Sequence, residues 1–208
     1  YPLPWEMNQQ TNIEKRPKRM LYLGRLHPEK GVLELVRTWC QLTETERKDW
    51  ELRIVGPWKK EQGGGGLEYL NQIRNEIKRG DARTELLGPI FSETEIIQEY
   101  KSSRIFVYPS LAEKGETFGL SILESMSLGC VPLVSSLPCF QDFVSPENGF
   151  IFDSKNGNFE SRLLQCLKNG IQTEASHQKF SDKAYEIAKE FEPSKVARLF
   201  LDDFKKME

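Results

Sequence analysis

Short apolar runs alternate with longer amphipathic segments along nearly the whole chain, and this alternation limits the choice of fold more than any other feature. Several short runs, such as Ile105–Tyr108, are continuously apolar, as strands covered on both faces tend to be. Strand–helix–strand repetition of this kind predicts a mostly parallel sheet with helices on both faces, in the α/β class. The predicted strands are Arg19–Gly24, Glu51–Gly56, Thr84–Leu87, Arg104–Tyr108, Val131–Ser135 and Gly149–Phe152. The predicted helices are Val32–Leu42, Leu67–Lys78, Glu93–Lys101, Leu120–Leu128, Phe159–Asn169, Ser181–Phe191 and Ser194–Lys206.

The charge balance excludes two broad classes of protein. The 208 residues include 29 Lys+Arg and 31 Asp+Glu, a formal net charge of −2. An apolar content of 38% together with a net charge near zero excludes a disordered chain. A chain-wide nucleic-acid binder would carry a strongly basic face, so we expect no nucleic-acid partner. A local basic cluster borders the first predicted strand and is interpreted as a solvated edge; it consists of Lys15, Arg16, Lys18 and Arg19.

Membrane and metal chemistry find little support in the sequence. The longest uncharged stretch, Ser125–Gln141, is interrupted by glycine and proline and is too short to cross a bilayer, so no transmembrane segment is expected. The four cysteines lie far apart, with no CxxC motif and no histidine close by. A disulfide framework or a zinc site is therefore not expected, and a reducing cytoplasm is the simplest compartment.

Four consecutive glycines, Gly63–Gly66, interrupt the pattern after the second predicted strand. Such a run could cradle phosphate, but it lacks the Lys-Ser/Thr ending of a Walker loop and does not follow the strand directly. We therefore interpret Pro57–Gly66 as a flexible insertion between a strand and a helix. No GxGxxG fingerprint occurs in the sequence, so a nicotinamide or flavin cofactor is not expected.

Cationic side chains follow the first predicted strand. This strand ends at Gly24, and Arg25 and Lys30 come before the next helix. In open α/β sheets, ligands bind at the carboxyl ends of strands. Two cations there suit a polyanionic ligand, because Arg can grip phosphate oxygens in a bidentate way. On this segment alone, a strand-end loop with solvated charges is an equal alternative.

Two carboxylates flank a helix that should begin near Gly119, after the fourth predicted strand. Helix N-termini offer free N–H groups and a partial positive charge, which suit a diphosphate. Glu124 lies about five residues into the helix, roughly 8 Å along its axis, and Glu116 lies in the preceding loop. Carboxylates accept hydrogen bonds from hydroxyls, so the pair could hold a ribose and a second sugar on either side of a diphosphate. The alternative is two surface acids, although Glu124 in an apolar face would be costly without a partner.

The order and spacing of these segments resemble the C-terminal half of a GT-B glycosyltransferase, in the large retaining family often numbered four and also called glycosyl transferases group 1. Gly24-Arg25 followed by Lys30-Gly31 is similar to the family's G-R-x4-K-G segment. Glu116 and Glu124 are similar to its E-x7-E signature. Further similar segments, which extend the resemblance over nearly the whole chain, are Leu52–Gly56, Leu87-Gly88 and Asn148–Phe150.

This resemblance implies a role for each matching residue. Arg25, Lys30 and Glu116 would be the catalytic residues. The two cations would stabilise the negative charge on the departing diphosphate without a metal or another cofactor, while Glu116 would position the donor sugar. Glu124 would bind the ribose hydroxyls. The other implied donor contacts are Gly24, the amides of Phe118, Gly119 and Leu120 on the phosphates, and Gly88, Pro89 and Ile90 beside the base.

The resemblance also implies that the chain is one half of a two-domain enzyme. Residues 1–18 would be an interdomain linker or edge segment, and 19–192 a Rossmann-like, doubly wound domain that binds the nucleotide sugar. Residues 193–208 would form a helix that packs toward an N-terminal domain absent from this chain, and that domain would bind most of a saccharide or glycolipid acceptor. The full-length enzyme would be cytoplasmic, with room for peripheral attachment to a membrane. The family's glycine-rich turn ending in Glu is replaced here by Ser136–Asp142, where no site residue is assigned.

The sequence thus predicts the donor-binding domain of a retaining glycosyltransferase, which moves a sugar from a nucleotide diphosphate sugar to an acceptor hydroxyl in glycan, lipopolysaccharide or capsule biosynthesis. This half alone should be inactive in transfer. A sugar-nucleotide epimerase on the same fold is one alternative, but it would need acid/base groups at the sugar, and the E-x7-E pattern disfavours it. A non-enzymatic flavodoxin-like module is another; it would need acidic strand ends, where this chain has Gly24-Arg25 and Gly56-Pro57.

Overall fold

Six strands form one sheet in the order β3-β2-β1-β4-β5-β6, and each neighbouring pair is parallel. The computed structural model describes residues 1–7, 12–80, 82–155 and 158–205. The predicted α/β class and parallel sheet are confirmed, and the strand order is that of a doubly wound Rossmann-like fold. The strands are β1 (Arg19–Leu23), β2 (Glu51–Val55), β3 (Thr84–Leu87), β4 (Ile105–Tyr108), β5 (Val131–Ser135) and β6 (Phe150–Phe152).

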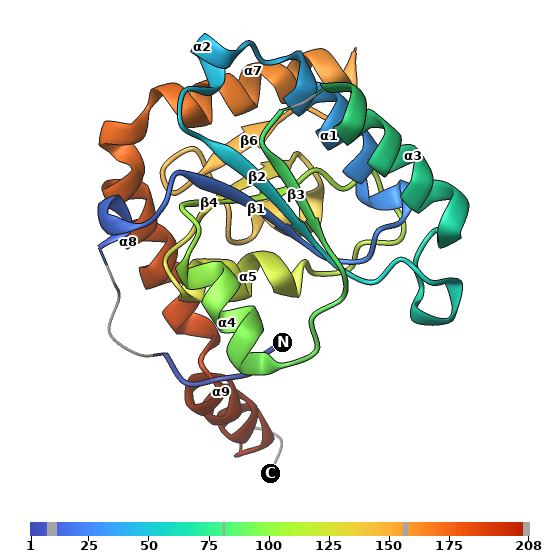
Figure 1. The fold of residues 1–208 in the computed structure, drawn as a ribbon. Helices are drawn as coiled ribbons and strands as arrows, with labels where there is room; N and C mark the ends of the chain where they lie inside the picture. The colour runs from blue at the N-terminus through green and yellow to red at the C-terminus, as the bar shows by residue number, and fades with distance from the viewer. Residues whose placement is uncertain (8–11, 81, 156–157, 206–208) are drawn as a thin grey trace.

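Helices cover both faces of the sheet, as Figure 1 shows. On one face α1 packs against α3 and α7, and on the other α5 packs against α8 with α4 beside it. The longer helices are α1 (Val32–Gln41), α3 (Gly66–Gly80), α4 (Glu93–Lys101), α5 (Leu120–Ser127), α7 (Phe159–Gln172), α8 (His177–Ala188) and α9 (Pro193–Lys205). The short ones are α2 (Glu44–Arg47), α6 (Pro138–Gln141) and the 3-10 turns η1 (Ile13–Lys15), η2 (Pro28–Lys30), η3 (Lys60–Gln62), η4 (Glu174–Ser176) and η5 (Lys189–Phe191).

Most predicted elements are present, with small differences at their ends. The largest difference is α8, which begins at His177 rather than at Ser181, because the buried His177 ring extends the apolar face of the helix toward Trp50. The single-turn helix α2 was not predicted; it is closed by a capping box between Thr43 and Glu46.

The sheet opens at the point where its strand order reverses. β1 pairs with β2 as far as its last residue, Leu23, but its pairing with β4 ends at Leu21↔Phe106. Beyond that point the rings of Tyr22 and Tyr108 stack on each other, with centroids 5.8 Å apart. The carboxyl ends of β1 and β4 therefore border the crevice in which doubly wound sheets bind their ligands.

The basic cluster at the start of β1 is only in part the solvated edge that the sequence predicts, because Lys15 is exposed but the two arginines are not. Arg16 is only 6% exposed. Its guanidinium donates to the carbonyl of Leu128 at 2.7 Å and to that of Ser103 at 3.0 Å. Arg19 pairs with Glu51 at 2.6 Å. These two arginines join loops at the amino ends of the strands, because a guanidinium can satisfy several carbonyl groups at once.

The first residues of the chain and helix α9 lie near each other below the sheet in Figure 1. The Leu3 amide donates to the carbonyl of Phe191 at 2.8 Å, and the Trp5 indole donates to Ser127 at 3.0 Å. Of the expected linker 1–18, residues 8–11 lie outside the described residues, as do 206–208 of the expected C-terminal segment. Across the described ranges, no helix is both long enough and apolar enough to cross a membrane.

Candidate functional site

Two loops meet at the carboxyl ends of β1 and β4, and they carry the predicted cations and the first predicted carboxylate. A backbone hydrogen bond of 2.8 Å from Leu111 to Glu29 joins the loops. Gly31, the N-cap of α1 with a φ of 67°, lies directly against the Pro109 carbonyl, where any Cβ would clash. Glycine is therefore required at Gly31 to bring the two loops together.

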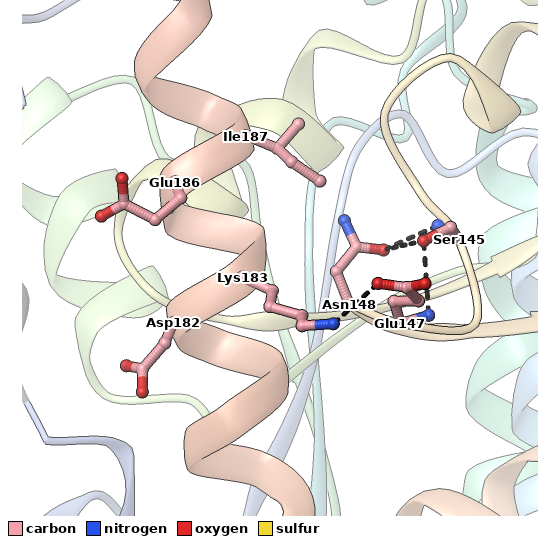
Figure 2. A pocket seen from close by; sticks show the side chains of 7 residues that line it. All are labelled: Ser145, Glu147, Asn148, Asp182, Lys183, Glu186 and Ile187. Atoms are coloured by element: carbon pink, nitrogen blue, oxygen red, sulfur yellow. Dashed lines mark hydrogen bonds and ion pairs between the residues drawn. The ribbon is translucent and has the colours of Figure 1, made fainter.

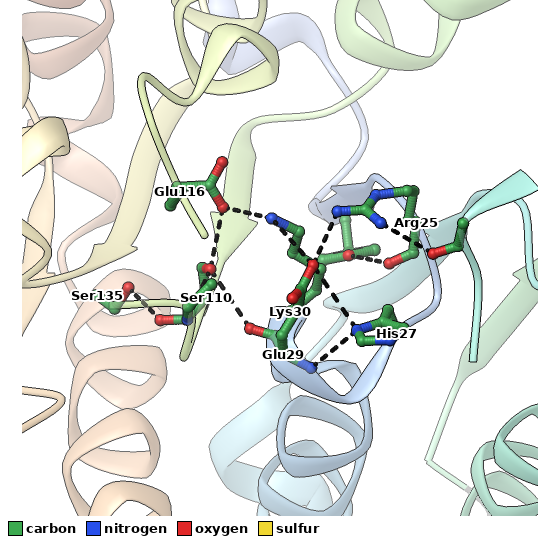
Figure 3. Close-up of polar contacts among 10 residues, drawn as sticks. Arg25, His27, Glu29, Lys30, Ser110, Glu116 and Ser135 are labelled. Atoms are coloured by element: carbon green, nitrogen blue, oxygen red, sulfur yellow. Dashed lines mark hydrogen bonds and ion pairs between the residues drawn. The ribbon is translucent and has the colours of Figure 1, made fainter. Parts of the chain in front are cut away.

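Lys30 and Glu116 form a buried ion pair between these loops (Figure 3). The distance from Lys30 Nζ to Glu116 Oε2 is 2.6 Å, and the two side chains are 5% and 11% exposed. The Ser110 hydroxyl donates to the same Oε2 at 3.0 Å, and the Ser135 hydroxyl donates to the Ser110 carbonyl at 2.7 Å. Burial raises the pKa of Tyr108, and the nearby Glu116 carboxylate raises it further. Glu116 is thus held in one place by a cation and a hydroxyl.

Arg25 lies beside this pair and is linked to it through Glu29. The Arg25 guanidinium donates to Glu29 Oε1 at 2.8 Å and to the Gly63 carbonyl at 3.0 Å. The same Glu29 oxygen lies 3.9 Å from Lys30 Nζ and 3.7 Å from His27 Nδ1. Figure 3 shows these side chains converging on Glu29. The site therefore concentrates positive charge around a carboxylate near the surface.

The Pro57–Gly66 insertion differs from the predicted flexible linker. All four glycine amides donate to backbone carbonyls: Gly63 to Lys60, Gly64 to Lys59, Gly65 to Leu26 and Gly66 to Trp58, at 2.7–2.9 Å. The insertion is a closed turn that rests on the loop after β1, because these local hydrogen bonds fix its backbone.

The first turn of α5 borders the loop that carries Glu116. Gly119 is the N-cap, and the helix begins at Leu120, as predicted. The Phe118 ring contacts Phe143 and Phe191, with centroids 5.5 Å and 5.9 Å away. This aromatic packing anchors the start of the helix, whose first N–H groups lack helical acceptors and carry partial positive charge.

Glu124 lies further along α5 and does not join the Lys30–Glu116 pair. Its carboxylate accepts a hydrogen bond of 3.0 Å from the Tyr100 hydroxyl on α4. Burial raises the pKa of Glu124, and the Tyr100 hydrogen bond lowers it in part. The partner that an acid in an apolar face needs is therefore Tyr100.

Gly88, Pro89 and Ile90 lie apart from the cations. They line a hollow of about 430 Å³ between the end of β3 and α4, together with Leu87, Glu95, Gln98 and Glu99. β3 is two strands away from β1, which corresponds to about 10 Å at the usual strand spacing. These predicted donor residues therefore lie in separate places: at the hollow, in the first turn of α5, at Glu124 further along that helix, and in the cluster of Arg25, Lys30 and Glu116.

A different hollow of about 400 Å³ lies against α8 (Figure 2). One of its walls is the loop before β6, so in a parallel sheet it faces the amino ends of the strands, opposite the crevice. Its polar groups are largely paired with each other: Lys183 contacts Glu147 at 2.7 Å, and Asn148 accepts from the Ser145 amide at 2.6 Å. Within the described residues, no group of three or more His, Cys, Asp or Glu side chains could hold a metal ion.

Sequence reasoning missed Ser110, Ser135 and Glu29 as parts of the site. Ser110 and Ser135 are fully buried at strand ends, where a polar side chain usually has a specific partner. Their position directly after or at the end of an apolar strand is a sequence signal for such a role. Glu29 carries no comparable signal, because a single acid in a charged loop is ordinary.

Comparison with known proteins places the chain among sugar-transferring enzymes. The family model for Glycosyl transferases group 1 matches residues 4–187. The lipopolysaccharide 1,2-N-acetylglucosaminetransferase of Salmonella typhimurium is 28% identical over 66% of this chain. The O-antigen chain mannosyltransferase B of Escherichia coli is 30% identical over 72% of it. The matched segments cover only about a third of these relatives, 35% and 36% of their lengths.

The fold is shared with solved glycosyltransferase structures. The pneumococcal O-GlcNAc transferase GtfA, in complex with UDP and GlcNAc, superposes with a TM-score of 0.75. The match covers 97% of this chain and 38% of the other, at 20% sequence identity. At this identity the likeness concerns the fold, and the predicted half of a GT-B architecture is confirmed in that sense.

Proposed function

The chain belongs to the glycosyl transferases group 1 family, and we propose that it is the donor-binding part of a retaining glycosyltransferase. Its ligand would be a nucleotide diphosphate sugar, bound across the carboxyl ends of β3, β1 and β4. The reaction would move the sugar to an acceptor hydroxyl during the synthesis of a lipopolysaccharide or a related glycan. The relatives support this assignment through their names, which describe transfer of N-acetylglucosamine and mannose.

The observation that carries the proposal is the Lys30–Glu116 pair at the crevice, with Arg25 and the start of α5 beside it. An ammonium group has three N–H donors, so Lys30 can hold Glu116 at 2.6 Å and still donate to a phosphate oxygen. Arg25 is 44% exposed and can meet a second phosphate. As the sugar–oxygen bond breaks, negative charge grows on the diphosphate, and these fixed donors stabilise it.

Glu116 would position the transferred sugar. Lys30 and Ser110 both bind its Oε2, and Figure 3 shows the other oxygen pointing away from them. That oxygen can accept a hydrogen bond from a sugar hydroxyl without disturbing the ion pair. The role is one of orientation, which contributes to catalysis by holding the reacting carbon in line with its partners.

The nucleoside would extend along the sheet edge toward β3. Glu124, with one carboxylate oxygen on Tyr100, would accept hydrogen bonds from the ribose hydroxyls. Pro89 and Ile90 would lie beside the base at the hollow next to α4. UDP in the pneumococcal structure makes a uridine donor the first candidate.

The acceptor would bind mainly to a part of the whole protein outside this chain. Support comes from length, since the 138 and 152 matched residues are only 35% and 36% of these relatives, which makes the relatives about twice as long as this chain. It also comes from α9, whose exposed apolar side chains would pack toward such a part; these are Leu199, Phe200, Leu201 and Phe204. Residues 1–18 would then be the linker or edge segment, 19–192 the donor domain and 193–208 the returning helix.

The whole protein would work in the cytoplasm at a membrane surface. All four cysteines are free, which suits a reducing compartment. The acceptor named for the Salmonella typhimurium relative is a lipopolysaccharide, and its lipid would place the reaction beside a bilayer. The epimerase and flavodoxin-like alternatives are not favoured, because the matched family consists of glycosyl transferases.

Thermal unfolding with nucleoside diphosphates tests the proposal. UDP, GDP and ADP are each added with a chelator present, because the proposed phosphate site contains no metal. At about 100 times its dissociation constant, a true ligand raises the free energy of unfolding by roughly 2.7 kcal/mol. We expect such a shift with at least one diphosphate and a smaller one with the matching nucleoside. No shift with any of them at millimolar concentration would contradict the proposed function.

A further inference from the structure

The turn at residues 59–65 packs directly against the side chain that the proposed function assigns to a phosphate. The Gly63 carbonyl accepts from Arg25 Nη1 at 3.0 Å, while Glu29 holds Nη2 at 2.8 Å. A Cβ on Gly63 would lie only 3.0 Å from both Arg25 Cδ and Nη1. The guanidinium therefore lies between the Glu29 carboxylate and the backbone of Gly63.

The turn is fixed to the backbone of the same loop that carries Arg25. The Leu26 amide donates to the Pro57 carbonyl at 2.8 Å, and the Gly65 amide donates to the Leu26 carbonyl at 2.7 Å. Both bonds are made by Leu26, the residue after Arg25, so a displacement of the turn would carry the Gly63 acceptor away from the guanidinium or pull on the loop itself.

Gly64 is the residue that allows the turn to close. A Cβ at this position would lie 2.3 Å from the carbonyl carbon and oxygen of Trp58. Backbone atoms cannot give way as a flexible side chain can, so any larger residue must move the turn. Gly66, the first residue of α3, provides a contrast: its Cβ would meet only the flexible Lys60 side chain, at 3.0 Å.

An exposed arginine samples many rotamers, and fixing it upon binding opposes affinity. We propose that the turn at residues 59–65 is a positioning element for Arg25, which pre-organises its guanidinium for the distal phosphate of a nucleoside diphosphate. The proposal rests on the proposed function, because it assumes that Arg25 binds the diphosphate. It gives the glycine run a specific task that neither the family resemblance nor the phosphate-loop alternative provides.

The test is a double-mutant cycle between Gly64→Ala and Arg25→Ala, with Gly66→Ala as the matched control. Calorimetric titrations use UDP and GDP, with UMP and GMP as ligands that lack the distal phosphate. Arg25→Ala should weaken diphosphate binding about tenfold, the usual effect of losing a charge-assisted hydrogen bond. Gly64→Ala should weaken it about fivefold and the monophosphate by much less, and the effect should disappear in the Arg25→Ala background.

The control variant is strained by its backbone, since Gly66 has a φ of 84°, whereas its Cβ would meet only a flexible side chain and so leaves the turn in place. It should lower the melting temperature while keeping diphosphate affinity within about twofold. A Gly64→Ala effect that is the same with and without Arg25, or the same on mono- and diphosphates, would overturn the positioning role alone. Unchanged affinity in Arg25→Ala would overturn the proposed phosphate role of Arg25, and the positioning role with it.

Discussion

Lys30 and Glu116 are 86 residues apart in sequence, yet Lys30 Nζ lies 2.6 Å from Glu116 Oε2, and both side chains are almost entirely buried. Each side chain therefore neutralises the charge of the other, which would otherwise be buried without a partner. This pair connects the loop after β1 to the loop after β4, and the proposed donor would bind around it.

Removing one member of the pair should cost stability. Lys30→Ala would leave the Glu116 carboxylate buried without its cation, and such losses cost about 3 kcal/mol or more. Urea unfolding followed by circular dichroism measures the change. Lys114→Ala, an exposed lysine in the same loop as Glu116, is the control and should change the free energy of unfolding by less than about 0.5 kcal/mol.

The double variant Lys30→Met with Glu116→Gln separates charge from packing. It removes both charges, so it should be more stable than Lys30→Ala. If Lys30→Ala were no more harmful than Lys114→Ala, the buried pair would not exist in solution.

Ser110→Ala should loosen Glu116 while leaving the cations in place. The lost hydroxyl donates to Glu116 Oε2 at 3.0 Å, and its removal should cost about 1 kcal/mol of stability. In the proposed site Glu116 faces the sugar, so affinity for a nucleotide sugar should fall while affinity for the nucleoside diphosphate stays constant. Titration with UDP and with a UDP-sugar gives the ratio of the two affinities. Ser121→Ala on α5 is the control. Equal losses for both ligands would contradict the assignment of Glu116 to the sugar.

His177 should make stability fall under mildly acidic conditions. Burial lowers the pKa of this imidazole, and the positive charge of Arg104 lowers it further. The hydrogen bond to the Gly170 carbonyl and the charge of Glu174 raise it in part. In the unfolded chain the pKa is about 6.5. Below that pH the unfolded state takes up a proton that the folded state resists, so stability is full above about pH 6.5 and declines toward the folded pKa, by at most about 1.4 kcal/mol per pH unit.

Urea unfolding from pH 8 to pH 5 checks this prediction. His177→Gln should remove the decline between pH 6.5 and pH 5, whereas His27→Gln, at the half-buried second histidine, should retain it. Parallel curves for the wild-type protein and His177→Gln would show that His177 does not resist protonation in the folded state.

Residues 1–208 alone should bind the donor but transfer no sugar. Orientation of the acceptor can contribute about 7–11 kcal/mol to lowering a barrier, and we propose that the acceptor surface lies outside this chain. Chromatography of a labelled nucleotide sugar, with simple saccharides as acceptors, should show slow hydrolysis at most. A chimera in which this chain follows the N-terminal half of a relative should restore sugar transfer. Glu116→Ala in that chimera should abolish the transfer. Efficient transfer by the isolated chain would place acceptor contacts within it.

The architecture was predictable because strands covered on both faces have a strong sequence signal. The apolar run ending at Tyr108 and the charged loop after Gly24 follow local patterns, and parallel topology then brings their ends together. The start of α5 at Leu120 was also predictable from a local pattern, because a glycine precedes the apolar residues of the helix.

Other features depend on contacts between distant segments and were not predictable. The pairing of Lys30 with Glu116 depends on how closely two loops approach, which Gly31 permits. Arg16 is buried because carbonyl groups from remote loops surround its guanidinium. The glycine run was interpreted as flexible because composition does not reveal its backbone hydrogen bonds.

A crystal structure of this chain with its preferred nucleoside diphosphate would test the central claim most directly. The claim predicts phosphate oxygens within hydrogen-bonding distance, about 2.7–3.2 Å, of the Arg25 guanidinium, Lys30 Nζ and the first amides of α5. It also predicts the ribose beside Glu124. A nucleotide bound elsewhere, for example in the hollow against α8, with Arg25 and Lys30 free of phosphate, would contradict the account.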